Sequence, residues 1–130
     1  MTTLLILAGT IFSEAGLEKP AGRRLVADTL YWRATKTGLR EVALKPRQYS
    51  CWNPDSYRKS TQATLAAVQK MNGPVWRDCL DLAQQLLNGT YKPTTACTHY
   101  YNPKLCRPAW ARMLVGKVRI GSHIGGQIRP

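Results

Sequence analysis

A short apolar run near the N-terminus constrains the fold more than any other feature of this sequence. Its apolar residues are spaced to cover most of a helix surface: Leu4, Leu5, Leu7, Ala8, Ile11 and Phe12. A helix that is apolar on nearly all sides belongs in a protein core. Thr2 or Thr3 can cap its start, and Gly16 is placed to end it in a left-handed cap. No Lys or Arg precedes the run, which is too short to span a membrane, so we interpret it as a structural helix and not as a signal peptide.

A carboxylate stands at the end of this run. Glu14 follows Phe12 and Ser13 in the last expected helical turn. The C-terminal end of a helix carries partial negative charge, and apolar neighbours exclude water, so both effects should raise the pKa of Glu14. A carboxyl group with a raised pKa can donate a proton at neutral pH. On this local pattern alone, an ordinary exposed glutamate is the simpler alternative.

The remaining pattern predicts an α+β protein in the form of one mainly helical domain, residues 1–130, with a small irregular or β wing. Pro74 suits the first turn of the clearest later helix, and Asn88-Gly89 should stop it. Glycines make the C-terminal tail look loosely held. Helices are expected at about 22–37, 60–70, 74–88 and 109–115, an irregular or short-stranded segment at 39–57, and a loop or hairpin at 90–110.

The amino-acid composition limits the kinds of partner that this protein is expected to bind. The 130 residues include 19 Lys and Arg against 7 Asp and Glu, which gives a net charge of +12 and favours an anionic partner. The basic residues are scattered and form no long block of the kind that marks an RNA-binding tail. With so few acids, the candidates for a carboxylate catalyst can be considered one by one.

Four cysteines are compatible with two disulfides or with four thiols. Their spacing does not match a zinc site, His99 and His123 form no metal motif, and we expect no cofactor. Cys97 and Cys106 flank "THYYNPKL", and a bridge there would restrain the two tyrosines. We therefore predict a Cys97–Cys106 disulfide, with a Cys51–Cys79 disulfide as the second pairing.

Five short motifs occur in a fixed order: "FSEAGLEKP", "QYSCWN", "THYYNP", "PAWAR" and "RIGSHIG". Together they resemble the SleB-type cell-wall hydrolase family, which includes spore cortex-lytic enzymes and phage endolysins. The resemblance extends from about Ala8 to Gly125. It implies a lysozyme-like α+β fold that acts on peptidoglycan, and it places the family's catalytic acid at Glu14.

Glu18 is the main candidate for a second catalytic acid. Glu18 matches the second acid of the family's "EARGE" stretch, but "EAGLEKP" has an apparent extra residue before the proline, so the loop geometry departs from the pattern. Asp28 and Asp55 are weaker candidates. One acid suffices for a lytic transglycosylase, in which the muramyl 6-hydroxyl attacks C1. We favour that reaction, with hydrolysis by a lysozyme-type pair as the alternative.

The other motifs contain residues that could line the walls of a substrate-binding cleft. Tyr49 and Trp52 could stack on sugar rings. Alternatively, one of these rings could lie in the core while the other anchors the loop. Ser50 could form a hydrogen bond with the substrate or with Glu14. If "HYY" is extended, Tyr100 and Tyr101 point to opposite sides, one to the cleft and one to the core. Asn102 could bind acetamido groups or serve a turn. His99 is assigned to the same substrate-binding wall, and His123 to packing or hydrogen bonding.

These features predict a bacteriolytic phage endolysin that cleaves the β-1,4 bond between N-acetylmuramic acid and N-acetylglucosamine. Its expected partners are the glycan strands of peptidoglycan and the anionic bacterial envelope, with no specific nucleic acid. We expect a monomer without a transmembrane segment, made in the host cytoplasm and released to the periplasm or cell wall. A zinc amidase is disfavoured because no zinc site is apparent, and a basic nucleic-acid-binding protein is the alternative from another class.

Overall fold

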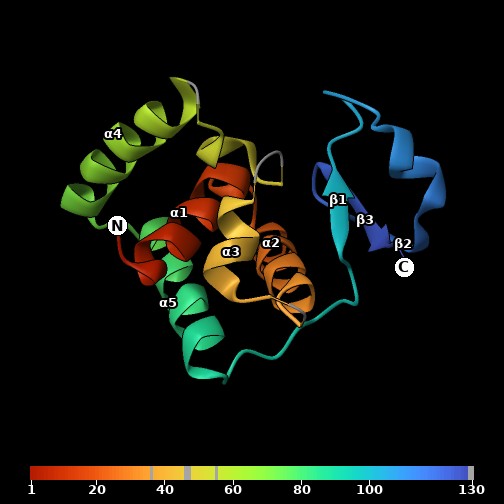
Figure 1. Cartoon of the computed structure of the whole chain (residues 1–130), viewed down its shortest axis with the longest axis horizontal. Coiled ribbons are helices and arrows are strands. Elements are labelled where there is room, and N and C mark those ends of the chain that lie inside the picture. Colours follow the sequence, from red (N-terminus) through yellow and green to blue (C-terminus); the bar gives the residue numbers. More distant parts are fainter. Residues whose placement is uncertain (36, 46–47, 55, 129–130) are drawn as a thin grey trace.

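The computed structural model describes residues 1–35, 37–45, 48–54 and 56–128. Within these residues, a helical part contains five α-helices and a short 3-10 helix, and a wing carries a three-stranded sheet (Figure 1). The helical elements are α1 (Thr3–Ala15), α2 (Pro20–Arg33), α3 (Leu39–Leu44), η1 (Ser50–Trp52), α4 (Ser56–Met71) and α5 (Pro74–Asn88). The wing holds β1 (His99–Tyr101), the 3-10 helix η2 (Ala109–Met113), β2 (Val115–Ile120) and β3 (His123–Gln127).

Helix α1 is the core helix that its apolar pattern predicts. It packs against α5, α2 and α3, and its buried residues run from Ile6 to Ile11 without a break. The Thr2 side chain caps its start by accepting the Leu5 N–H at 3.2 Å. The prediction for Gly16 was wrong, because this residue has right-handed helical dihedrals. Crowding explains why a glycine occupies this position, since a Cβ there would lie 2.5 Å from the carbonyl oxygen of Phe12.

The later helices follow the sequence pattern with three differences. Gly89 ends α5 in a left-handed conformation (φ 77°), as predicted. Helix α2 stops at Arg33, four residues earlier than expected, and the segment predicted to be irregular or short-stranded is partly helical, with α3 and η1. Third, the helix expected at 109–115 is a 3-10 helix that ends at Met113, and Val115 begins β2. Tertiary packing explains the second difference, because Val42 and Ala43 of α3 are buried against the core.

The C-terminal segment is not loosely held. Strand β3 is the centre of the antiparallel sheet, which has the order β1-β3-β2. Gly125 allows this strand to lie against the helical part, because a Cβ there would be 2.9 Å from Cys97 Sγ and 3.1 Å from Leu25 Cδ1. The glycines that suggested flexibility therefore serve close packing.

A buried aspartate holds the connection that leads from α5 to the wing. Asp28 of α2 is fully buried, and its carboxylate accepts hydrogen bonds from the backbone N–H groups of Thr94 and Thr95, from both threonine hydroxyls, and from the Tyr91 hydroxyl. Such a set of donors compensates the desolvation of a buried carboxylate. Asp28 is thus a structural anchor that fixes where β1 begins, and it is not a catalytic acid.

The predicted disulfides are contradicted, because all four cysteines are free thiols. Cys97 precedes β1, whereas the backbone N–H of Cys106 bonds to the Asn102 carbonyl at the far end of that strand. An extended strand rises about 3.3 Å per residue, which carries the two sulfurs beyond the reach of a disulfide. Cys51 and Cys79 are buried as separate thiols. None of the helices within the described residues is long and apolar enough to cross a bilayer.

Candidate active site

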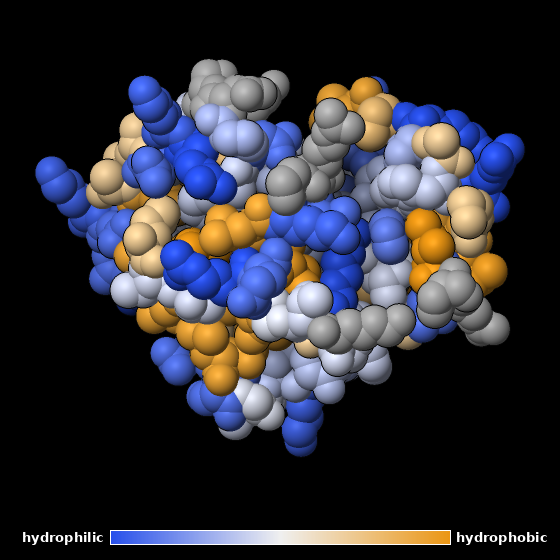
Figure 2. All heavy atoms as spheres, viewed as in Figure 1, coloured by the Kyte–Doolittle hydropathy of each residue, from blue (hydrophilic) through white to orange (hydrophobic). Residues whose placement is uncertain are grey.

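A cleft of about 960 Å³ lies between the helical part and the wing. In the space-filling view, the outline of the molecule is notched between these two parts (Figure 2). The helical wall includes the end of α1, Arg33 of α2, Ser50, and Ser60, Thr61 and Thr64 of α4. The wing contributes β1, the turn that follows it, Trp110 and the residues Ser122 and His123 at the start of β3. Among the lining residues that the structure describes, the only carboxylates are Glu14 and Glu18.

Glu14 occupies the last turn of α1, half-buried in the wall of the cleft. Burial raises the pKa of its carboxyl above the usual value, which confirms the direction predicted from the apolar helix end. Three groups oppose this shift because they stabilise the carboxylate: the Tyr100 side chain, the Arg33 charge and the backbone N–H of Ser50. The group is therefore able to hold a proton and is also equipped to carry the negative charge once that proton has left.

Tyr100 connects Glu14 to the wing. Burial is the main cause that raises the pKa of the Tyr100 hydroxyl well above its ordinary value, so this side chain remains a hydrogen-bond donor at neutral pH. Its ring meets the His123 ring edge-on, with centroids 5.1 Å apart. Tyr101 points the other way and packs against Ala111, Leu114 and Trp110 in the wing. The alternation predicted for the two tyrosines is thus correct, although the edge of Tyr101 also borders the cleft.

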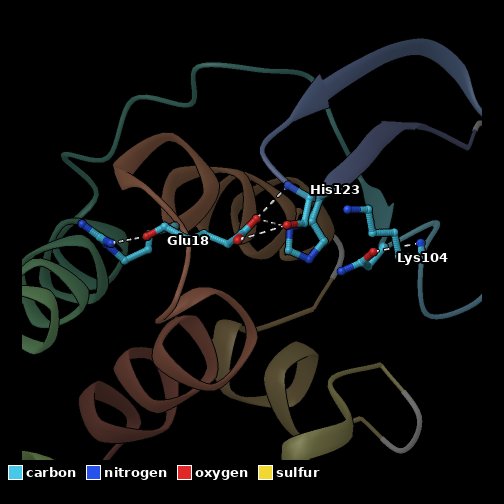
Figure 3. Close-up of polar contacts among 6 residues, drawn as sticks. Glu18, Lys104 and His123 are labelled. Carbon is cyan, nitrogen blue, oxygen red and sulfur yellow. Dashed lines mark hydrogen bonds and ion pairs between the residues drawn. The ribbon is translucent and has the colours of Figure 1, made fainter.

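Glu18 binds the wing with its side chain (Figure 3). Its carboxylate accepts the Ser122 N–H at 2.9 Å and lies 3.3 Å from Nδ1 of His123, while its carbonyl oxygen accepts a bond from Arg23. The contact to His123 has the distance of an ion pair without hydrogen-bond geometry, and Nδ1 has no hydrogen-bond partner among the described residues. Burial lowers the pKa of His123, which keeps the ring neutral at neutral pH. Glu18 therefore connects the α1–α2 loop to the β2–β3 turn.

Two predicted sugar-stacking residues are not in the cleft. Tyr49 and Trp52 are 1% and 3% exposed, and both belong to the helical core. The Tyr49 hydroxyl bonds to Thr29 at 2.9 Å, and the Trp52 indole N–H donates to Thr10 at 2.7 Å. The stacking prediction was wrong because the helical core buries both rings. Between them, Ser50 does reach the site, through its backbone N–H to Glu14.

The segment after β1 is a turn that borders the cleft. Asn102 lines the cleft, but its side-chain oxygen accepts the Lys104 N–H at 3.0 Å, which is turn chemistry (Figure 3). His99 also lines the cleft and contacts the Trp110 ring edge-on at 5.0 Å. Burial and the nearby Arg33 charge lower the pKa of His99 to about 4, so its ring is a neutral polar group at the cleft wall.

Sequence reasoning missed several cleft residues. Arg33 is the most important, because its charge acts on Glu14, Tyr100 and His99. Its position in the last turn of a helix with Lys and Arg residues on either side gave no local reason to single it out. Ser60 and Thr64 of α4 also line the helical wall, and no sequence motif distinguishes them. Asp55, a weak candidate acid, lies outside the described residues, and no group of three or more His, Cys, Asp or Glu side chains among those described could hold a metal ion.

Comparison with known proteins identifies the family. Residues 18–124 match the sequence model of the cell wall hydrolase family, Hydrolase_2. The chain belongs to the cell wall hydrolase family. Membership makes it a peptidoglycan-cleaving enzyme of the SleB type. Glu14 precedes the matched region, so the family match does not reach this residue. A search of curated proteins finds no match.

Solved structures confirm the fold of this cell wall hydrolase. The catalytic domain of the germination-specific lytic transglycosylase SleB from Bacillus anthracis is similar, with a TM-score of 0.70 and 18% identity over 96% of this chain and 93% of that one. The catalytic domain of SleB from Bacillus cereus is similar with a TM-score of 0.66 and 18% identity, over 96% and 89%. The chain thus has the lysozyme-like α+β fold that its sequence motifs imply.

Proposed function

We propose that this cell wall hydrolase is a lytic transglycosylase that cleaves the β-1,4 bond between N-acetylmuramic acid and N-acetylglucosamine. The observation that carries the proposal is the environment of Glu14, a half-buried carboxyl with a raised pKa that also receives donors able to stabilise its anion. A single residue can then act as acid and afterwards as base.

The reaction has two proton transfers. Glu14 first protonates the leaving 4-oxygen of N-acetylglucosamine as the C1–O4 bond breaks and positive charge develops at C1. The muramyl 6-hydroxyl then attacks C1, and Glu14 accepts the proton that this oxygen loses. The product ends in 1,6-anhydro-muramic acid, and no water is consumed. Tyr100 and the Ser50 N–H stabilise the Glu14 carboxylate between the two transfers.

The position of Glu18 supports a single-acid mechanism. Glu18 lines the same cleft, which keeps a lysozyme-type pair as the second candidate, but its carboxylate already accepts the Ser122 N–H and faces His123. These contacts favour a structural role for Glu18 over activation of a water molecule.

We also propose that the enzyme acts as a phage endolysin that is released from the host cytoplasm to the periplasm or wall and works as a monomer. The support is its charge of +12, which suits an anionic envelope.

Mass spectrometry of muropeptides tests the reaction, after digestion of purified peptidoglycan in ¹⁸O-labelled water. Anhydro-muramic ends without label are the expected product. Reducing muramic ends that each carry one labelled oxygen would show hydrolysis and reject the transglycosylase mechanism.

A further inference from the structure

We propose that the guanidinium of Arg33 is a carboxylate-binding subsite beside Glu14, which makes the enzyme select glycan strands that carry free carboxylates over neutral ones. The inference rests on the proposed function, because it names the part of the peptidoglycan substrate that this wall of the cleft recognises.

Arg33 is held in a defined place at the cleft wall. Its Nε donates to the carbonyl oxygen of Thr98 at 2.6 Å, and its Nη1 donates to the side-chain oxygen of Gln48 at 2.5 Å. The guanidinium carbon lies 5.5 Å from the centre of the Tyr49 ring. These contacts come from three separate segments and fix the plane of the guanidinium. They leave its Nη2 group without a protein partner among the described residues, in a side chain that lines the cleft.

Arg33 forms no salt bridge with a carboxylate among the described residues. The ion pair of an arginine in this part of the chain joins Arg23 to Asp78. The acid whose pKa it lowers is Glu14, and burial opposes ionisation of that group. A positioned cation that forms no salt bridge can bind an anion, and a guanidinium binds carboxylates well because its N–H groups match their two oxygens.

Peptidoglycan offers this chemistry in two places. A muramic acid residue without a peptide has a free lactyl carboxylate, and a residue with a stem peptide has carboxylates on the peptide. Polymers of N-acetylglucosamine alone have neither. Both sources share one functional group, so the subsite is defined by the carboxylate, and the experiment must separate the two sources.

Binding should be measured with Glu14→Gln protein, so that no strand is cleaved during the titration. The ligands are soluble glycan strands with stem peptides, strands whose peptides an amidase has removed, and both kinds after conversion of their carboxylates to amides. We expect amidation to weaken binding by about tenfold or more in at least one pair, which is the scale of a charge-assisted hydrogen bond. The pair that responds identifies the peptide or the lactyl group as the source.

The matched variants are Arg33→Gln and Arg77→Gln, each in the Glu14→Gln background. Arg77 is exposed on α5 and outside the cleft lining, so its loss removes the same charge without touching the site. Arg33→Gln should bind acid and amide strands almost equally, whereas Arg77→Gln should keep the preference. Because Arg33 also braces Thr98 and Tyr49, Arg33→Lys is the second variant. It keeps the charge but loses the planar fork, so its acid preference should fall at least about threefold.

Three results would overturn the subsite: equal binding of acid and amide strands by protein with Arg33 intact, an undiminished preference in Arg33→Gln, or an undiminished preference in Arg33→Lys. Failure of the proposed function looks different, since digests of untreated peptidoglycan by wild-type protein would then contain no 1,6-anhydro-muramic ends. Normal formation of these ends combined with indifference to amidation would reject the Arg33 subsite alone.

Discussion

The carboxylate of Glu18 accepts the backbone N–H of Ser122 at 2.9 Å, although the two residues are 104 positions apart in the chain. This bond joins the loop after α1 to the β2–β3 turn, where Gly121 adopts a left-handed conformation (φ 57°). A Cβ at Gly121 would lie 2.8 Å from Glu18 Oε1, so the turn and the carboxylate fit each other closely. This contact holds the wing in position relative to the helical part at the mouth of the cleft.

Substitutions of Glu18 should separate structure from catalysis. Glu18→Gln keeps an acceptor for Ser122 and should retain substantial lytic activity. Glu18→Ala should lower the free energy of unfolding by about 1–3 kcal/mol, because a partly buried N–H loses its partner. Activity assays and chemical denaturation measure the two effects, with Glu41→Gln, an exposed glutamate on α3, as the control. An inactive but folded Glu18→Gln, together with reducing ends in the digest, would instead assign Glu18 as the second catalytic acid.

Replacement of Glu14 by Gln should abolish most lysis without unfolding the protein. We expect activity to fall by at least about a hundredfold, the scale of a lost general acid. The measurement is the initial rate of turbidity loss of purified peptidoglycan, and circular dichroism checks the fold. Near-wild-type lysis by the folded variant would show that Glu14 is not the proton donor.

The raised pKa of Glu14 also affects stability. A carboxyl whose folded pKa is raised contributes stability below its unfolded pKa of about 4.5 and loses it as the pH rises through the folded pKa. Glu14→Gln lacks this loss, so its stability relative to wild type should increase as the pH rises above about 4.5. Because both proteins share His99 and His123, the difference in their unfolding free energies reports Glu14. A difference that is constant with pH would mean that the pKa of Glu14 is not raised.

Tyr100→Phe should change the pH profile of lysis. The Tyr100 hydroxyl favours the Glu14 carboxylate, so its removal raises the pKa of Glu14 further. The fall in activity on the alkaline side, where the acid loses its proton, should therefore move to higher pH. Rates of lysis across the pH range measure this shift, and Tyr31→Phe, an exposed tyrosine on α2, is the control. An alkaline limb that stays in place or moves to lower pH would contradict the assigned contact.

Lysis should weaken as salt increases. The charge of +12 acts on an anionic wall through water, and ions screen this attraction beyond about 10 Å at about 0.1 M salt. The test compares purified peptidoglycan with permeabilised cells over a range of salt concentrations. A flat response in both would show that the charge serves another purpose.

Thiol labelling tests the cysteine arrangement. Cys106 is exposed and should react rapidly with a thiol reagent in the native protein. Cys51 and Cys79 are buried, and burial raises the pKa of each to about 12, so they should react only after unfolding. Cys97 is also buried and should be protected. Peptide mapping without reductant identifies the labelled sites, and a Cys97–Cys106 bridge in that map would contradict the free thiols.

The sequence by itself determined the features that depend on neighbours along the chain. The apolar spacing from Leu4 to Phe12 predicts α1, because periodicity decides which helix faces are buried. The same short stretch places Glu14 at the helix end and predicts the direction of its pKa shift. Order and spacing of the short motifs predicted the cell wall hydrolase family and its fold.

Only the tertiary structure decided which side chains face the cleft. Tyr49 and Trp52 sit in a promising motif, yet Thr29 and Thr10 hold them in the core. The sequence around Arg33 gives no sign that it lines the cleft, yet hydrogen bonds to Gln48 and Thr98 hold it beside Glu14. The physical reason is that burial and hydrogen bonding depend on segments that are distant in the chain, and only folding brings these together.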